Sequence, residues 1–125
     1  MFFLIVSKMP HVVLNGSINS EKAFEYLENI FLKNELGILK TTNLYLDKTK
    51  QAILVESLAI ERGQKTGFLA MINNREDGFV VRIYPEFDNF EKTDGVKQIL
   101  AEIAKQLLEK INNIEIGKNN LQEFL

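Results

Sequence analysis

The chain contains no cysteine, and this absence excludes several classes of protein at once. Disulfide scaffolds, thiolate zinc sites, iron–sulfur centres and cysteine nucleophiles all need thiols. The single histidine, His11, argues against an imidazole metal site built within one chain. We therefore expect neither a metal nor a cofactor. A chain without thiols also fits the reducing cytoplasm, which is the location we expect.

The sequence also lacks the common motifs that indicate nucleotide binding or serine catalysis. Neither of the two glycine-rich phosphate-binding patterns, G-x-x-x-x-G-K-[ST] and G-x-G-x-x-G, occurs in the sequence. No serine lies in a G-x-S-x-G context, so a serine triad is not indicated. The sequence therefore names no reaction, and we favour a protein that is not an enzyme.

Charge of one sign and long apolar runs are equally scarce. The net charge is −2, and the charged residues are interspersed rather than grouped, so the basic stripe of a nucleic-acid binder is absent. The apolar run from Met1 to Val6 is shorter than the ~7–15 residues of a signal-peptide core. It is also far below the ~20 residues that cross a bilayer. We expect no nucleic-acid partner and no membrane, and we interpret this run as a strand.

What the sequence does contain is a predicted meander of four β-strands between residues 38 and 85. Its 125 residues, 46% of them hydrophobic, are enough for one domain with a core. The strands, rich in β-branched and aromatic residues, are Ile38–Leu46, Gln51–Glu61, Thr66–Asn73 and Phe79–Pro85. Short polar breaks that carry Asp47, Gly63 and Gly78 separate them, so neighbouring strands should form antiparallel hairpins.

Two amphipathic helices flank the meander. The first is predicted from Glu21 to Lys33 with Ser20 as its N-cap, and the second from Gly95 to Asn112. We predict an α+β fold, in which both helices pack on one face of a four- to five-stranded antiparallel sheet.

The two ends of the single domain 1–125 are less strongly patterned. Residues 1–10 contain a candidate extra strand at Phe2–Val6, and a second apolar run follows at His11–Leu14. We expect at least one of these two runs to add a fifth strand to the sheet. Pro10 lacks a backbone donor and marks a strand end or an edge. Residues 118–125 are predicted to be a loose tail, unless Leu121, Phe124 and Leu125 dock as a short hook.

This order of elements resembles, in outline only, that of frataxin-like proteins and of small secretion chaperones. The first predicted helix lacks an acidic row of the frataxin kind, and no helix interrupts the meander as in the chaperones. The resemblance therefore implies a layered α+β architecture and no function.

Alternation along the strands divides the sheet into two faces, and the hairpins set which residues share a face. The predicted pairs include Leu44 with Ile53, Glu56 with Met71, and Leu69 with Arg82. The predicted core face consists of Ile38, Leu44, Leu46, Ile53, Val55, Ala59, Phe68, Ala70, Ile72, Phe79, Val81 and Ile83, with the polar residues Lys40, Thr42, Ser57, Glu61 and Thr66 among them.

The opposite face is mixed, with an apolar middle and a polar border. It consists of Leu39, Thr41, Asn43, Tyr45, Leu54, Glu56, Leu58, Ile60, Leu69, Met71, Asn73, Val80, Arg82 and Tyr84. Contiguous apolar residues on a solvent-facing surface usually mark an interface or a groove. The candidate ligand or interface residues are therefore Glu56, Arg82, Tyr84, Tyr45, Leu54, Leu58, Leu69 and Met71.

Glu56 is the most informative of these residues. A carboxylate among apolar neighbours must find a partner, or its pKa rises through desolvation. We expect Arg82 to reach it from across the sheet, either as a ligand-gripping pair or as a structural ion pair.

Two functions remain open. The first is a non-catalytic binding or assembly module that self-associates, as a homodimer, or binds another protein through the open sheet face or the last helix. The alternative is a small-molecule-binding protein or enzyme with a pocket on the same face around Glu56, Arg82 and Tyr84.

Overall fold

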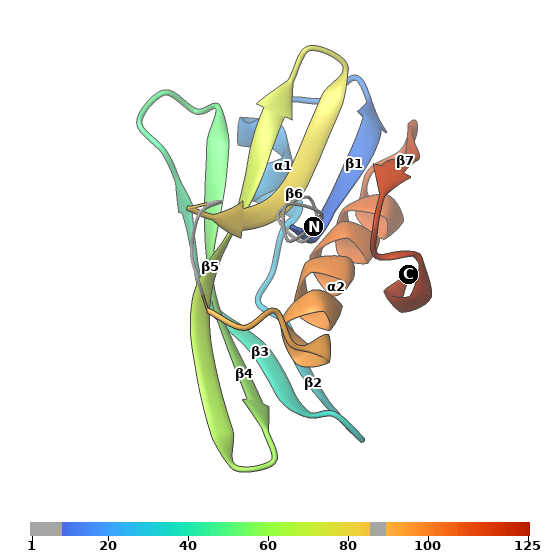
Figure 1. Ribbon diagram of the computed structural model, residues 1–125. Coiled ribbons are helices and arrows are strands. Elements are labelled where there is room, and N and C mark those ends of the chain that lie inside the picture. Colours follow the sequence, from blue (N-terminus) through green and yellow to red (C-terminus); the bar gives the residue numbers. More distant parts are fainter. Residues whose placement is uncertain (1–8, 86–89) are drawn as a thin grey trace, which may run out of the picture.

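The computed structural model describes residues 9–85 and 90–125, which form a curled antiparallel sheet of seven strands with two α-helices (Figure 1). The strands are β1 His11–Gly16, β2 Phe31–Asn34, β3 Gly37–Leu46, β4 Ala52–Glu61, β5 Gln64–Arg75, β6 Gly78–Tyr84 and β7 Ile114–Asn119. The helices are α1 Ser20–Tyr26 and α2 Asp94–Lys110, with a short 3₁₀ helix η2 at Gln122–Phe124. The α+β class is confirmed, but the predicted sheet of four or five strands is too small.

The order across the sheet is β2-β3-β4-β5-β6-β1-β7. The strand predicted at His11–Leu14 is β1, which lies between β6 and β7. The strand predicted at Phe2–Val6 lies outside the described residues. The last residues of the chain do not form the predicted loose tail. Leu121 is 1% exposed and packs in the core, as the hook alternative required.

The meander exists, but each hairpin is offset by two residues from the predicted register. Leu44 pairs with Val55, Glu56 with Leu69, and Met71 with Arg82. The turns explain the offset between β4 and β5, because Arg62 and Gly63 alone make a two-residue turn with φ of 51° and 78°. Such paired positive φ angles suit the twist of a tight hairpin. A shift of two residues preserves the faces, whereas a shift of one would exchange them.

A bulge in β3 exchanges the predicted faces of the residues that precede it in that strand. Thr41 pairs with Ser57 and Asn43 with Glu56, so Thr42 is an extra residue. On the β2 side of the bulge, Leu39 is fully buried. The predicted placement of Leu39 and Thr41 on the open face is therefore wrong, and so is that of Ile38 on the core face.

The first helix is shorter than predicted and ends at Tyr26. Its N-cap is Asn19, whose side chain accepts a hydrogen bond from the Lys22 amide. Ser20 is instead buried and donates to the Gln51 carbonyl. Residues 31–33, predicted as helix, form with Asn34 the edge strand β2 along β3. Pairing with the otherwise unpaired edge of β3 overrides the helical spacing, because each β2 pair satisfies backbone groups of both strands.

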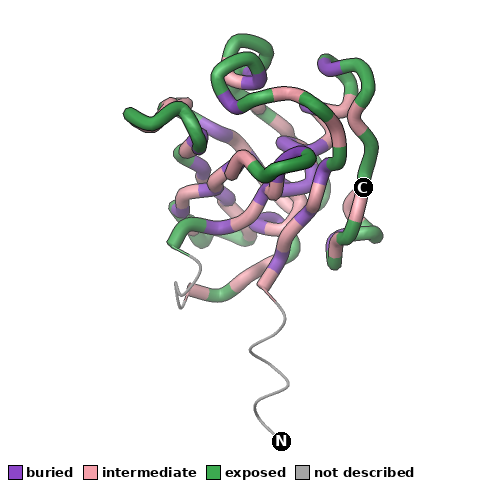
Figure 2. Tube along the Cα trace, turned by 90° about the horizontal axis from the view of Figure 1, so that it is seen from above, coloured by how far each residue is buried: buried purple, intermediate pink, exposed green. Residues whose placement is uncertain are grey.

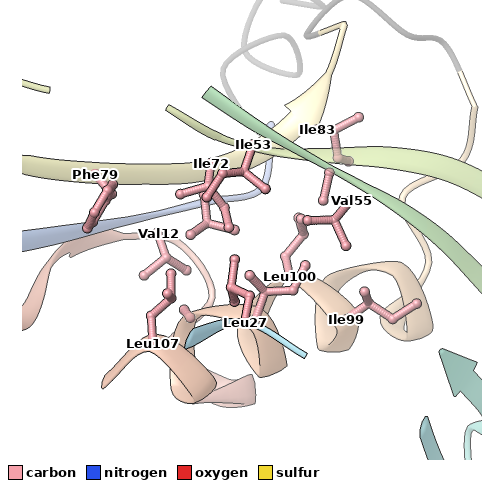
Figure 3. Close-up of a cluster of buried hydrophobic side chains, with 14 of the residues drawn as sticks. Val12, Leu27, Ile53, Val55, Ile72, Phe79, Ile83, Ile99, Leu100 and Leu107 are labelled. Atoms are coloured by element: carbon pink, nitrogen blue, oxygen red, sulfur yellow. The ribbon is translucent and has the colours of Figure 1, made fainter. Parts of the chain in front are cut away.

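Both helices pack on one face of the sheet, as predicted. Buried and exposed positions alternate along the strands in Figure 2. The apolar stripe of α2 faces the inner side of the sheet, where Ile99 and Leu100 lie toward Val55 and Leu107 lies near Val12 (Figure 3). The core face prediction holds for Ile53, Val55, Ala59, Phe68, Ala70, Ile72, Phe79, Val81 and Ile83, all buried. Neither of the two helices that the structure describes is long and apolar enough to cross a membrane.

Candidate functional site

The side of the sheet turned away from α1 and α2 is called the open face. Its apolar middle spans the central strands β4, β5 and β6. The residues of this middle, each half-buried, are Leu54, Leu58, Leu69, Met71 and Val80. None of them belongs to the buried core cluster. The predicted apolar middle is therefore present, and no helix that the structure describes lies on it.

Six cross-strand rows order the open face from one end of the strands to the other. The rows are Lys33–Ile38–Ile60–Lys65, Phe31–Lys40–Leu58, Asn43–Glu56–Leu69–Tyr84, Tyr45–Leu54–Met71–Arg82–His11, Asn73–Val80–Val13 and Arg75–Gly78–Asn15–Glu115. Paired residues within a row lie on neighbouring strands and touch, because opposed Cβ atoms are about 4.5–5.5 Å apart. The predicted candidates thus do share one surface.

Glu56 has partners, but they differ from the expected one. Its Oε1 atom accepts hydrogen bonds from Asn43 Nδ2 at 2.9 Å and from Thr42 Oγ1 at 2.7 Å. The hydrogen bond from Asn43, followed by that from Thr42, lowers the pKa of the Glu56 carboxyl below its ordinary value. The side chain is exposed, so desolvation is too weak to reverse this shift. The carboxylate stays ionised at neutral pH.

Arg82 lies in the neighbouring row, and the expected Glu56–Arg82 pair is not formed. Arg82 is opposite Met71, with its Nη2 atom 3.6 Å from the Met71 sulfur. Glu56 makes no ion pair within residues 9–85 and 90–125. Arg82 lies two strands and one row away from Glu56, whereas Thr42 and Asn43 lie on the adjacent strand and donate directly to its carboxylate.

Tyr45 and Tyr84 border the middle and are 49% and 41% exposed. They stand at opposite edges of adjacent rows, so they frame the aliphatic residues rather than converge on one point. Tyrosine in such a position is common at protein interfaces.

The sequence missed several residues of this face. Phe31 was placed in a helix, yet its side chain is 67% exposed beside Lys40. Lys40 and Ile38 were placed on the core face, because the alternation was continued through Thr42. The one available signal was the polar run Thr41-Thr42-Asn43, where a bulge could have been suspected.

One cavity among the described residues lies away from the open face, and a second touches this face at Val80 and Arg82. The first, of about 560 Å³, sits at the N-terminal end of α2, and its polar lining includes Glu61, Arg62 and Lys92. The second, of about 180 Å³, lies between Met9, Pro10 and Val80, at the end of β1 and β6. Within the described residues, no three acidic or histidine side chains are grouped as metal ligands would be. Leu54, Leu58, Leu69 and Met71 line neither of these two cavities, so this part of the face is a surface for contact.

Comparison of the chain with protein-family models, with curated proteins and with solved structures found no match. The function of the open face is inferred from its own geometry and chemistry.

The Glu56 hydrogen bonds make a testable prediction. In a carbon-detected NMR titration, the Glu56 carboxyl should titrate below 4.5, its ordinary value. Combining Asn43→Ala with Thr42→Val should move the midpoint upward, because both donors to the ionised form are lost. A lowered folded-state pKa stabilises the fold above the unfolded-state pKa, and this contribution disappears as the pH falls through the folded-state value. A midpoint at or above 4.5 in the unmodified protein would contradict the assignment.

Proposed function

We propose that the protein is a non-catalytic binding module whose open face docks another polypeptide chain. The observation that carries the proposal is the apolar middle of this face, continuous over three neighbouring strands. Apolar surface of this kind marks binding sites more often than it marks plain solvated surface. The tyrosine border and the half-buried aliphatic centre match the composition of protein interfaces.

The polar groups of the face also favour docking over catalysis. Glu56 is held by two neighbours on its own and the adjacent strand, and its pKa is lowered rather than raised. A general base is usually tuned in the opposite direction, toward the working pH. The small-molecule alternative needs Glu56, Arg82 and Tyr84 to converge. Leu69 stands between Glu56 and Tyr84 in their shared row, and Arg82 stands in the next row opposite Met71.

The last helix offers less for self-association. Its apolar stripe is already packed against the sheet, with Val96, Ile99, Leu100, Ile103 and Leu107 all buried. The open face therefore supplies the contact surface, whether the bound chain is a second copy or a different protein.

The test is to select binding peptides from a random displayed library on the immobilised full chain. Binders to the unmodified protein should be lost on Met71→Glu and on Leu58→Glu, since a carboxylate desolvates poorly against an apolar partner. Met71→Glu should fold, because position 71 is half-buried and lies beside Arg82. Light scattering after size exclusion, run on the same variants, reports whether a second copy uses the face.

The matched control is Ile116→Glu, the same kind of change at an exposed residue of β7. Binding that survives both open-face variants but is lost on Ile116→Glu would place the interface elsewhere and sink the proposal. Circular dichroism melts on all three variants separate loss of binding from loss of folding.

A further inference from the structure

We infer that the occupant of the open face is an acidic amphipathic segment of a different protein, rather than a second copy of this chain. This inference rests on the proposed docking function and names the chemistry of the partner. It comes from the distribution of charge on the face, which differs from that of the whole molecule.

The chain carries a net charge of −2, yet cations dominate the open face. Among residues 9–85 and 90–125, the sheet register places on it the cationic side chains of Lys33, Lys40, Lys65, Arg75 and Arg82. The carboxylates that the register places there are Glu56 in the middle and Glu115 on the edge strand β7. Three of the cations, Lys33, Lys40 and Lys65, surround the apolar side chains of Ile38, Ile60 and Leu58 at one end.

The same arrangement disfavours a dimer in which the face meets itself. In a two-fold interface the same patch is used by both subunits. Lysines occupy one end of the face and arginines the other, so either two-fold orientation brings cation toward cation. Like charges placed together across an interface oppose association. Glu56 offsets this repulsion between cations only in the middle of the face, where its carboxylate already accepts hydrogen bonds from Thr42 and Asn43.

The aliphatic middle selects a polypeptide over a nucleic acid or an anionic membrane. Stacking of unpaired bases needs aromatic platforms, but the middle residues are leucine, methionine and valine, and the aromatic residues Phe31, Tyr45 and Tyr84 lie at the border. An anionic membrane would meet the ionised Glu56 carboxylate in the centre of the contact. An amphipathic segment can instead place aliphatic side chains on Leu54, Leu69 and Met71 and carboxylates toward the lysines.

The experiment extends the peptide selection on the full chain. Peptides that depend on Met71 should be enriched in Asp and Glu flanking aliphatic residues, compared with the unselected library. Their affinity should fall about tenfold or more on Lys40→Glu combined with Lys65→Glu, and should weaken as salt is added. The matched control is Lys48→Glu combined with Lys97→Glu, an equal change of charge on a turn and on α2. Binding to this control should be unchanged.

The outcomes separate this inference from the function it rests on. Peptides that need Met71 but are neutral or basic, or that bind the Lys40/Lys65 variant normally, overturn the acidic partner and leave the docking face intact. A wild-type dimer that Met71→Glu splits does the same, since the occupant is then a second copy. Failure to select any peptide that depends on the open face, with a monomer in solution, overturns both.

Discussion

Replacing Phe79 with alanine should lower the free energy of unfolding by about 3–5 kcal/mol, the range for truncating a fully buried phenylalanine. Phe79 has no exposed surface and lies in the core cluster, opposite Leu14 of β1 (Figure 3). The substitution removes apolar contacts and leaves a cavity where β6, β1 and the inner layer meet. Because domains of this size are stable by only about 5–15 kcal/mol, the loss is a large fraction of the total.

Phe31→Ala is the matched control, since it makes the same truncation on a side chain that is 67% exposed. Surface substitutions usually change stability by no more than about 0.5 kcal/mol. Urea unfolding followed by circular dichroism measures both variants. A comparable loss for Phe31→Ala would mean that Phe31 is covered in solution, and a small loss for Phe79→Ala would contradict the described core.

Gly78→Ala should cost about 3 kcal/mol or more, because backbone strain of about 1–3 kcal/mol adds to a steric clash. Gly78 has a φ of 153°, and a Cβ atom there would lie 1.9 Å from the Leu14 carbonyl oxygen. That oxygen belongs to the backbone of β1 and cannot move independently. The substitution should therefore loosen the junction between β6 and β1, at the point where Gly78 pairs with Asn15.

Gly63→Ala separates the clash from the conformational cost. Gly63 also has a positive φ, 78°, but a Cβ atom there would have no neighbour within 4 Å. Its cost should be only the ~1–2 kcal/mol of placing an L-residue in the left-handed region. Amide hydrogen exchange should show faster exchange in β1 for Gly78→Ala and not for Gly63→Ala. Equal losses for both variants would show that the close approach of β1 is not real.

The faces of the central strands were predictable because they depend only on parity. Ile53, Ile72 and Val81 share one parity along their strands, and their side chains point inward whichever even offset the turns impose. The stripe of α2 was equally clear, because its period matches a helix packed on one side. These local patterns also located Leu54, Leu69 and Met71 on the open face.

What the sequence did not reveal depends on contacts between distant segments. The bulge at Thr42 follows from pairing with β4 and carries no signal of its own beyond a polar run. Phe31 fits a helical stripe with Leu27 but is recruited as a strand by the edge of β3. Glu56 accepts hydrogen bonds from Thr42 and Asn43 on the adjacent strand β3 rather than from Arg82, and the position of Thr42 follows from the bulge, which alternation does not reveal. Two of the lysines on the open face lie in the misplaced segments, Lys33 in β2 and Lys40 in the part of β3 that precedes the bulge.

The position of β1 between β6 and β7 has a consequence for synthesis on the ribosome. The strand β1 is synthesised before both of its neighbours in the sheet, β6 and β7, which come much later in the chain. Translation at about 5–20 residues per second leaves β1 without β6 for about 3–12 s after it is made. The apolar side chains of Val12 and Leu14 are open to chaperones during that interval. A chain released before residue 114 would keep one edge of β1 unpaired, and such an edge is a template for aggregation.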